Sequence, residues 1–287
     1  MDDAVRGAVE AAIGGSIRSA RPVHGGDVAA SYRVTLNDGT TIFAKTHAAA
    51  APDFFDTEAA GLRWLLEPRE LLVPDVLAVG HTPPFLVLEW IDEAGRADPR
   101  GATETAFGAS LARLHAAGAP CFGREDRRTT GSRRLPNDPA PTWAEFYRSR
   151  RLLPLARLAL EPAALPERSV RQLEDVAARL EEFDTAEPPA RLHGDLWAGN
   201  RLVDGNGRNW LIDPAAHGGS REFDLAMMRL FGGFGPGAYA AYAEVAPLAD
   251  GWQDRVALHQ IAPLVVHAIK FGGGYVGAAA DAIGRYA

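Results

Sequence analysis

The chain has 287 residues, 47% of them hydrophobic and 23% charged, with a formal net charge of −7 at pH 7. This apolar content supports a packed core and excludes a disordered chain, while the acidic balance argues against nucleic acid, whose binding needs basic groups that neutralise phosphates. The single cysteine, Cys121, excludes an internal disulfide. The chain begins without a recognisable signal segment, and no run reaches the roughly 18 apolar residues that span a bilayer. We therefore expect a cytoplasmic protein that binds neither nucleic acid nor a membrane.

Residues 1–90 are predicted to form an antiparallel sheet with one inserted helix, after a short helix at the N-terminus. Val5, Val9 and Ile13 share one stripe of that first helix. Alternating, β-branched segments indicate strands, and Asp38–Gly39 is typical of a hairpin turn. In chain order the predicted elements are a helix over 2–13, strands over 16–24, 30–36 and 40–45, a helix over 53–68, and strands over 76–80 and 84–90.

From residue 91 onward the pattern becomes mainly helical, so the chain is expected to divide into a smaller part, 1–90, and a larger part, 91–287. Phe107, Leu111 and Leu114 mark the buried face of one of these helices. The predicted elements are helices over 103–118, 142–159, 168–183 and from 221 onward, a loop over 120–141, and two short strands over 201–203 and 209–212 joined by a turn at 204–207.

The strongest chemical pattern lies around those two short strands. His193–Gly194–Asp195 is followed by Asn200, and Asp213 ends the second strand. Transfer of a phosphoryl group from ATP needs an aspartate that takes the proton of the attacking hydroxyl, together with amide and carboxylate oxygens that ligate Mg²⁺. The spacing matches the H-R-D-x-x-x-x-N segment of protein kinases. We interpret Asp195 as catalytic and Asn200 and Asp213 as metal ligands; the alternative is that all are ordinary turn and strand-end residues.

Lys45 and Glu58 form a second candidate group. The chain has 30 lysine and arginine residues, and only Lys45 and Lys270 are lysines. Lys45 ends a predicted strand, and Glu58 lies in the next helix beside Leu62, on an apolar stripe where a carboxylate needs a partner. Kinases hold a phosphate-binding lysine with an acid from such a helix. The alternative is an exposed lysine and an exposed glutamate.

Two further segments complete the predicted ATP site. Gly25 and Gly26 lie between the first two strands, where backbone could approach phosphates, although paired glycines also occur in plain tight turns. The segment Glu89, Trp90 and Ile91 lies at the end of the last predicted strand of the first part, where main-chain groups could bind the adenine edge.

Several segments resemble the fructosamine kinase, or ketosamine-3-kinase, family along nearly the whole chain. They are "LHGDLWAGN", "REFDLAM", "LFGGF" and "LHQIAPLVVHAIKFGGGYVGAA". The resemblance implies an α+β, two-lobed protein-kinase-like fold, with a small antiparallel-sheet lobe and a larger helical lobe. It also implies phosphorylation by ATP and Mg²⁺ of the sugar O3 of a ketosamine, which makes the adduct unstable and so repairs glycation of amines or lysine.

The resemblance also assigns roles to residues. It implies that Asp195 is the catalytic base and that Trp197 and His217 contribute to the acceptor site; the alternative for Trp197 is a core aromatic that braces the catalytic loop. It implies that Asp224 anchors the catalytic loop. Relatives often carry aromatic residues and a histidine before R-E, where this chain has His217-Gly218-Gly219-Ser220, so we expect a more open wall of the acceptor site there.

Two other functions remain open from the sequence. One is a kinase of the same fold that acts on an aminoglycoside, choline or an amino sugar; the other is a nucleotide-binding pseudokinase. The intact Asp195, Asn200 and Asp213 argue against the second. A protein kinase has no support, because D-F-G is replaced by "IDPA" and no Ala-Pro-Glu is present. Fructosyl, ribulosyl and erythrulosyl adducts all remain possible acceptors.

Overall fold

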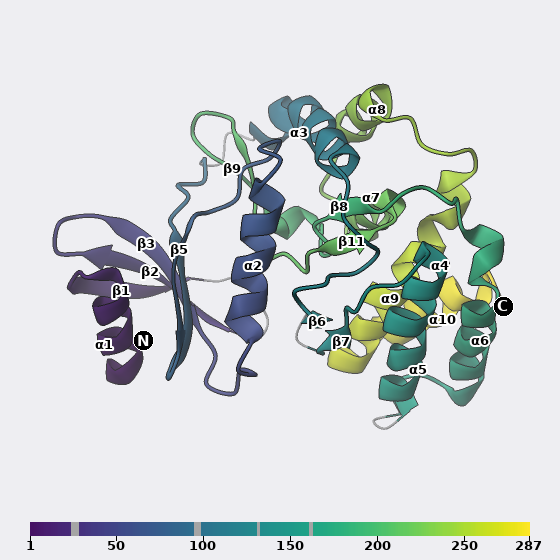
Figure 1. The fold of residues 1–287 in the computed structure, drawn as a ribbon, viewed down its shortest axis with the longest axis horizontal. Helices are drawn as coiled ribbons and strands as arrows, with labels where there is room; N and C mark the ends of the chain where they lie inside the picture. The colour runs from purple at the N-terminus through teal and green to yellow at the C-terminus, as the bar shows by residue number, and fades with distance from the viewer. Residues whose placement is uncertain (24–28, 95–98, 131–132, 161–162) are drawn as a thin grey trace. The chain divides into compact units, whose positions relative to one another are not determined.

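The computed structural model describes residues 1–23, 29–94, 99–130, 133–160 and 163–287 (Figure 1). The chain forms two compact units. Unit 1 contains Met1–Thr103 and Arg201–Pro214, and unit 2 contains Glu104–Asn200 and Ala215–Ala287. The predicted lobe boundary after residue 90 stays a prediction. Across the described residues, none of the helices combines the length and the apolar content that a membrane span requires.

Unit 1 is built on a five-stranded antiparallel sheet. Its strand order is β1 (Ile17–Val23), β2 (Ala30–Leu36), β3 (Thr41–Thr46), β5 (Pro84–Glu89) and β4 (Val76–His81). Helix α1 (Asp3–Ile13) and helix α2 (Phe54–Leu66) lie on opposite faces of the sheet (Figure 1). Val5 and Val9 pack against Ile42 and Ala44 of β3, as the predicted stripe requires. Strand side chains alternate between faces, so Lys45, next to Ala44, points to the face of α2.

A second hairpin belongs to unit 1 although it lies far along the chain. Strands β9 (Arg201–Val203) and β10 (Asn209–Leu211) pair antiparallel, as predicted. The Leu211 amide donates to the Leu72 carbonyl at 2.8 Å, which docks the hairpin on unit 1. In its turn, Asp204 is buried, which opposes ionisation, but hydrogen bonds from Arg208 and Trp210 lower its pKa to about 2. This docking places Asp213, two residues beyond β10, in unit 1.

Unit 2 is mainly helical. Its longer helices are α3 (Pro99–Ala116, which begins in unit 1), α5 (Leu153–Leu160), α6 (Glu167–Ala178), α7 (Arg221–Leu230), α8 (Pro236–Val245), α9 (Trp252–Phe271) and α10 (Gly274–Gly284). The helical pattern expected over 142–159 is present, as α4 (Trp143–Phe146), a π-helical turn (Tyr147–Leu152) and α5 in succession.

Four short strands in unit 2 have no counterpart in the prediction. The expected loop over 120–141 contains a short hairpin of β6 (Thr129–Thr130) and β7 (Leu135–Pro136). Strand β8 (Ala190–Leu192) pairs with β11 (His217–Gly219). Strands of two or three residues are too short for a two-residue alternation to identify.

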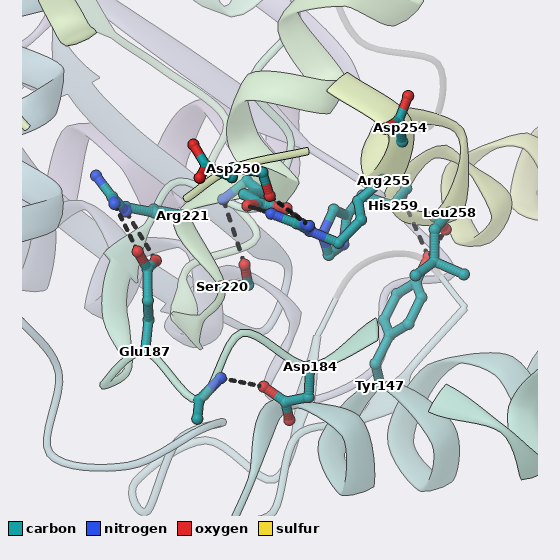
Figure 2. Close-up of polar contacts among 12 residues, drawn as sticks. Tyr147, Asp184, Glu187, Ser220, Arg221, Asp250, Asp254, Arg255, Leu258 and His259 are labelled. Carbon is teal, nitrogen blue, oxygen red and sulfur yellow. Dashed lines mark hydrogen bonds and ion pairs between the residues drawn. The ribbon is translucent and has the colours of Figure 1, made fainter. Parts of the chain in front are cut away.

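Helix α7 is held in unit 2 by buried ion pairs. Arg255 of α9 donates to both carboxylate oxygens of Glu222, at 2.8 and 2.6 Å, and Glu222 is almost fully buried. Arg221 makes a similar bidentate pair with Glu187, which precedes β8 (Figure 2). The Tyr147 hydroxyl donates to the main chain of α9 at Leu258 (Figure 2). These contacts fix α7, which carries Asp224.

The crossing of α3 and α8 gives a test of this packing. A Cβ on Gly108 would lie 1.9 Å from the Ala238 carbonyl oxygen, so Gly108→Ala must displace α8. We expect a loss of about 2–3 kcal/mol in the free energy of unfolding, measured by urea denaturation. The matched control is Gly277→Ala in α10, where nothing lies within 4 Å and alanine should add up to about 1 kcal/mol through helix propensity. Equal effects of the two substitutions would contradict the close crossing.

Candidate active site

The structure brings Lys45, Glu58 and Asp213 together within unit 1. The Lys45 Nζ lies 2.5 Å from the Glu58 Oε1 and 2.6 Å from the Asp213 Oδ1. Lys45 is only 6% exposed. The predicted pairing of Lys45 with Glu58 is therefore present, and Asp213 joins it because the β9–β10 hairpin docks on this unit.

Burial and charge act in opposite directions on this group. Burial by itself would lower the pKa of Lys45, but the two carboxylates outweigh it and raise that pKa, so the ammonium stays charged. Burial raises the pKa of Glu58 to about 7, against the attraction of Lys45. Glu58 is therefore the member that takes up a proton when the pH falls below neutral.

Asp213 has an unusual backbone. Its φ is +54°, in the left-handed region that side chains other than glycine rarely occupy. Its side chain is 34% exposed, and one oxygen binds Lys45. Residues held in such conformations cluster at functional sites.

In unit 2, Asp224 holds the loop that follows β8. Its carboxylate accepts hydrogen bonds from the amides of His193, at 2.7 Å, and Gly194, at 2.9 Å. Burial would raise the pKa of Asp224, but hydrogen bonds from His115 and from the loop lower it. Asp224 thus anchors the loop, as the resemblance implies. His115, which no sequence pattern singled out, lies 3.2 Å from Asp224 and, through its other ring nitrogen, 2.8 Å from the Tyr242 hydroxyl.

The loop itself places Asp195 and Asn200 side by side. Gly194 has φ of +80°, and a Cβ there would lie 2.2 Å from the Ala215 carbonyl oxygen, so only glycine fits. Asp195 follows and is partly exposed. The buried Asn200 donates its Nδ2 to the Asp195 carbonyl at 2.8 Å, which directs the amide oxygen elsewhere. Asp195 and Asn200 belong to unit 2, whereas Asp213 belongs to unit 1.

The two predicted acceptor residues differ sharply in exposure. Trp197 is 40% exposed and is not a core residue; its indole lies over Gly199, where a Cβ would come within 2.1 Å of the ring. His217 is buried and stacks on Phe146, with ring centroids 5.4 Å apart. Burial lowers the pKa of His217 to about 3, so the ring is neutral. Its role at the acceptor stays a prediction that this burial does not support.

The wall at Gly218 and Gly219 is closely packed, which contradicts the expected opening. A Cβ on Gly218 would lie 1.9 Å from the Cys121 carbonyl oxygen, and one on Gly219 would lie 2.7 Å from the Trp143 ring. Glycine is needed here because the backbone between Ala119 and Cys121 approaches β11.

The remaining predicted ATP-site residues lie at the end of β5. The Glu89 amide donates to the Asp75 carbonyl at 2.9 Å. The Trp90 ring stacks under the Arg33 guanidinium, 4.9 Å from its centroid, and Ile91 follows. Gly25 and Gly26 lie outside the described residues. The adenine and phosphate roles of these positions stay predictions.

Comparison with known proteins covers the whole chain. The sequence model of the family described as fructosamine kinase matches residues 1–287. The chain is 33% identical over 257 residues to the chloroplastic protein-ribulosamine 3-kinase of Arabidopsis thaliana, covering 87% of this chain and 77% of the plant protein. A protein of Enterococcus faecium with a provisional ketoamine kinase name is 36% identical over 260 residues, covering 88% of this chain and 90% of that protein.

Comparison with solved structures identifies the fold. The crystal structure of a candidate fructosamine-3-kinase from Thermobifida fusca is 39% identical, covers 100% of this chain and 99% of its own, and superposes with a TM-score of 0.88. LicA, solved in complex with AMP, has a TM-score of 0.68 over 100% of both chains at 14% identity, which shows the fold alone. The expected α+β, protein-kinase-like fold is confirmed.

The buried Lys45 group gives a stability prediction. Lys45→Met leaves two carboxylates without their cation, and we expect a loss of about 3–5 kcal/mol in the free energy of unfolding at pH 8. The double variant Lys45→Met/Glu58→Gln should recover more than half of the free energy of unfolding that Lys45→Met loses. A carboxyl whose pKa in the folded protein is raised above its ordinary 4.5 contributes stability at low pH, and this contribution is lost as the pH rises through the raised pKa. The loss of stability caused by Lys45→Met should therefore be smaller at pH 5 than at pH 8.

Urea denaturation at both pH values measures this effect. The control is Lys270→Met, which removes the other lysine of the chain and should change stability by less than about 0.5 kcal/mol. A loss that is the same at pH 5 and pH 8 would show that Glu58 is not the destabilised group.

Proposed function

The chain belongs to the fructosamine kinase family, and on this premise we propose that it is an ATP-dependent kinase that phosphorylates the sugar O3 of ketosamines. The acceptors are fructosamine or ribulosamine adducts of small amines or of lysine. The observation that carries the proposal is the placement of Lys45 between Glu58 and Asp213, at 2.5 and 2.6 Å. A kinase needs such an oriented cation for the ATP phosphates.

Unit 1 supplies the groups for ATP. Lys45 is the point charge that pairs with phosphate oxygens, and Glu58 holds it in place. Glu89, Trp90 and Ile91 are proposed to receive the adenine, and Gly25 and Gly26 the phosphates.

Asp213 of unit 1 and Asn200 of unit 2 are the proposed magnesium ligands, and the chemistry of each side chain suits the ion. With both carboxylates ionised, the Lys45 group carries more negative than positive charge, and Asp213 keeps one oxygen that does not bind Lys45. Asn200 has its nitrogen committed to Asp195, so its oxygen remains as a hard ligand. Within the described residues no cluster of three His, Cys, Asp or Glu side chains could hold a metal, but Mg²⁺ with ATP typically needs only one or two protein oxygens beside the phosphates. When bound, the ion neutralises charge on the ATP phosphates.

Unit 2 supplies the groups for the acceptor. The Asp195 carboxylate takes the proton of the O3 hydroxyl as that oxygen bonds to the γ-phosphorus, and the bond between the γ-phosphorus and the bridging oxygen breaks to release ADP. Asp224 keeps the loop rigid, so that Asp195 holds its position. The exposed indole of Trp197 offers an apolar face to the sugar carbons or a π-face to the protonated amine.

The product and its setting follow from the same proposal. A ketosamine that carries phosphate on O3 is prone to lose that phosphate by elimination, after which water cleaves the remaining sugar from the nitrogen, so the amine is freed and glycation is reversed. A cytoplasmic location remains a prediction, and the name of the Arabidopsis relative places that protein in the chloroplast.

Another kinase activity of the same fold is the second candidate. The choline kinase LicA has a TM-score of 0.68 to this chain at 14% identity, and that likeness extends only to the fold. The family match over all residues favours the ketosamine. The retention of Asp195, Asn200 and Asp213 favours catalysis over nucleotide binding alone.

An acceptor panel tests the reaction. The protein with MgATP is incubated with fructosyl, ribulosyl and erythrulosyl amines, an aminoglycoside and choline, and ADP release is measured. We expect ADP release with one or more ketosamines, and NMR of the product should place the phosphate on O3. Phosphate on choline or the aminoglycoside, with every ketosamine inert, would overturn the proposal.

Asp195→Asn tests the catalytic assignment. Removing the proton acceptor while keeping the shape should lower kcat by roughly 10²- to 10⁴-fold. The melting temperature and ATP affinity should stay close to those of the wild type. Asp281→Asn, on the exposed surface of α10, is the matched control and should keep full activity. Turnover of Asp195→Asn near the wild-type rate would remove Asp195 from its role.

A further inference from the structure

Exposed aromatic rings gather at one place in unit 2. Trp197, Phe231 and Phe271 are 40%, 40% and 50% exposed, which is unusual for large apolar side chains. They are linked through two partly buried rings, His267 and Tyr275. The ring centroids lie 6.2 Å apart for Trp197 and Phe231, 5.1 Å for Phe231 and His267, 5.0 Å for His267 and Tyr275, and 6.0 Å for Phe271 and Tyr275. We call these five residues the aromatic patch.

The turn after α7 fixes Phe231 beside the catalytic loop. Gly232 and Gly233 have φ of +70° and +87°, and a Cβ on Gly233 would lie 2.5 Å from the Ala198 side chain. Phe234 then stacks on Phe107, with centroids 5.5 Å apart. The turn is therefore packed on the loop that carries Asp195, and the exposure of Phe231 belongs to a closely packed element. The aromatic patch is continuous with the proposed acceptor site at Trp197.

The junction of α9 and α10 supplies the other rings. Gly272 and Gly273, both with positive φ, let the chain turn back so that Tyr275 meets His267. The His267 Nδ1 lies 2.7 Å from the Pro263 carbonyl oxygen. A carbonyl only accepts, so Nδ1 carries the hydrogen of this contact. The patch thus combines flat apolar faces with one imidazole ring.

The charges at the patch narrow the choice of ligand. None of its five residues is acidic, and one basic group lies close, since the Lys270 Nζ is 5.1 Å from the Phe271 centroid. A polycation such as an aminoglycoside needs carboxylates that the patch does not offer. An apolar or aromatic group that carries at most one ammonium suits it.

We propose that Phe231, His267, Phe271 and Tyr275 form a subsite for the group attached to the ketosamine nitrogen, next to the sugar held at Trp197. This inference rests on the proposed function. When the sugar O3 faces Asp195, the nitrogen and its substituent extend past Trp197 onto the neighbouring rings. The subsite then favours adducts with a long alkyl or aromatic arm over adducts of the smallest amines, since contiguous exposed apolar surface marks binding sites.

The test compares two acceptors that differ only in the arm, 1-deoxy-1-methylaminofructose and 1-deoxy-1-benzylaminofructose. We expect the wild type to show kcat/KM about tenfold higher for the benzyl compound, mainly through KM. Phe271→Ala and Phe231→Ala should reduce this ratio to below about three. Leu160→Ala, which removes a similarly exposed apolar side chain from α5, is the matched control and should keep the ratio.

The outcomes separate this inference from the proposed function. If ketosamines are phosphorylated but the wild type does not distinguish the two arms, the subsite is refuted and the proposed function stands. If no ketosamine is phosphorylated, the proposed function fails first. Equal losses for both acceptors in the Phe271→Ala and Phe271→Leu variants would show a packing role and refute the subsite. A dimer in sedimentation that Phe271→Ala dissociates, with an unchanged ratio, would show instead that the patch joins two copies of the chain.

Discussion

The burial of one ammonium group between two carboxylates governs unit 1. Lys45 is almost fully buried, and a buried charge is tolerated only when oppositely charged groups surround it. Glu58 comes from the helix that follows β3, but Asp213 lies 168 positions beyond Lys45 in the chain. The second carboxylate can reach Lys45 only because the β9–β10 hairpin docks on Leu72. The ion group and the hairpin therefore depend on each other, and both set the position of the proposed phosphate site.

Unit 2 also buries a carboxylate, and hydrogen bonds stabilise it there. The charge of the buried Asp224 is stabilised by the main-chain amides of His193 and Gly194 and by His115. Such hydrogen bonds to a carboxylate are stronger than neutral ones, and they hold the backbone on both sides of Gly194. The pairs of Arg255 with Glu222 and Arg221 with Glu187 fix the helix that carries Asp224. Rigidity of the proposed catalytic loop thus comes from α7 and its neighbours.

Much of this fold could be predicted because the periodic segments are long. The stripe of Val5 and Val9, the hairpin at Asp38–Gly39 and the helix around Leu111 are local patterns, and all appear where expected. The pairing of β8 with β11 could not be predicted, because three-residue strands have no readable period. The expected opening at Gly218 was wrong for a related reason. The presence of a glycine does not show what occupies the space beside its Cα atom. Beside Gly218 that space is occupied by the backbone at Cys121.

The same division holds for the candidate site. The residue types and their spacing were enough to select Lys45, Glu58, Asp195, Asn200 and Asp213, and to point to phosphoryl transfer, because that chemistry needs few groups and needs them in a fixed order. Family membership also follows from the sequence. Tertiary structure alone showed that Asp213 shares Lys45 with Glu58, that His115 supports Asp224, and that rings from α7, α9 and α10 gather beside Trp197. These contacts join segments that are distant in the chain. Which segments meet is decided by packing between elements, and such packing leaves no local periodicity in the sequence.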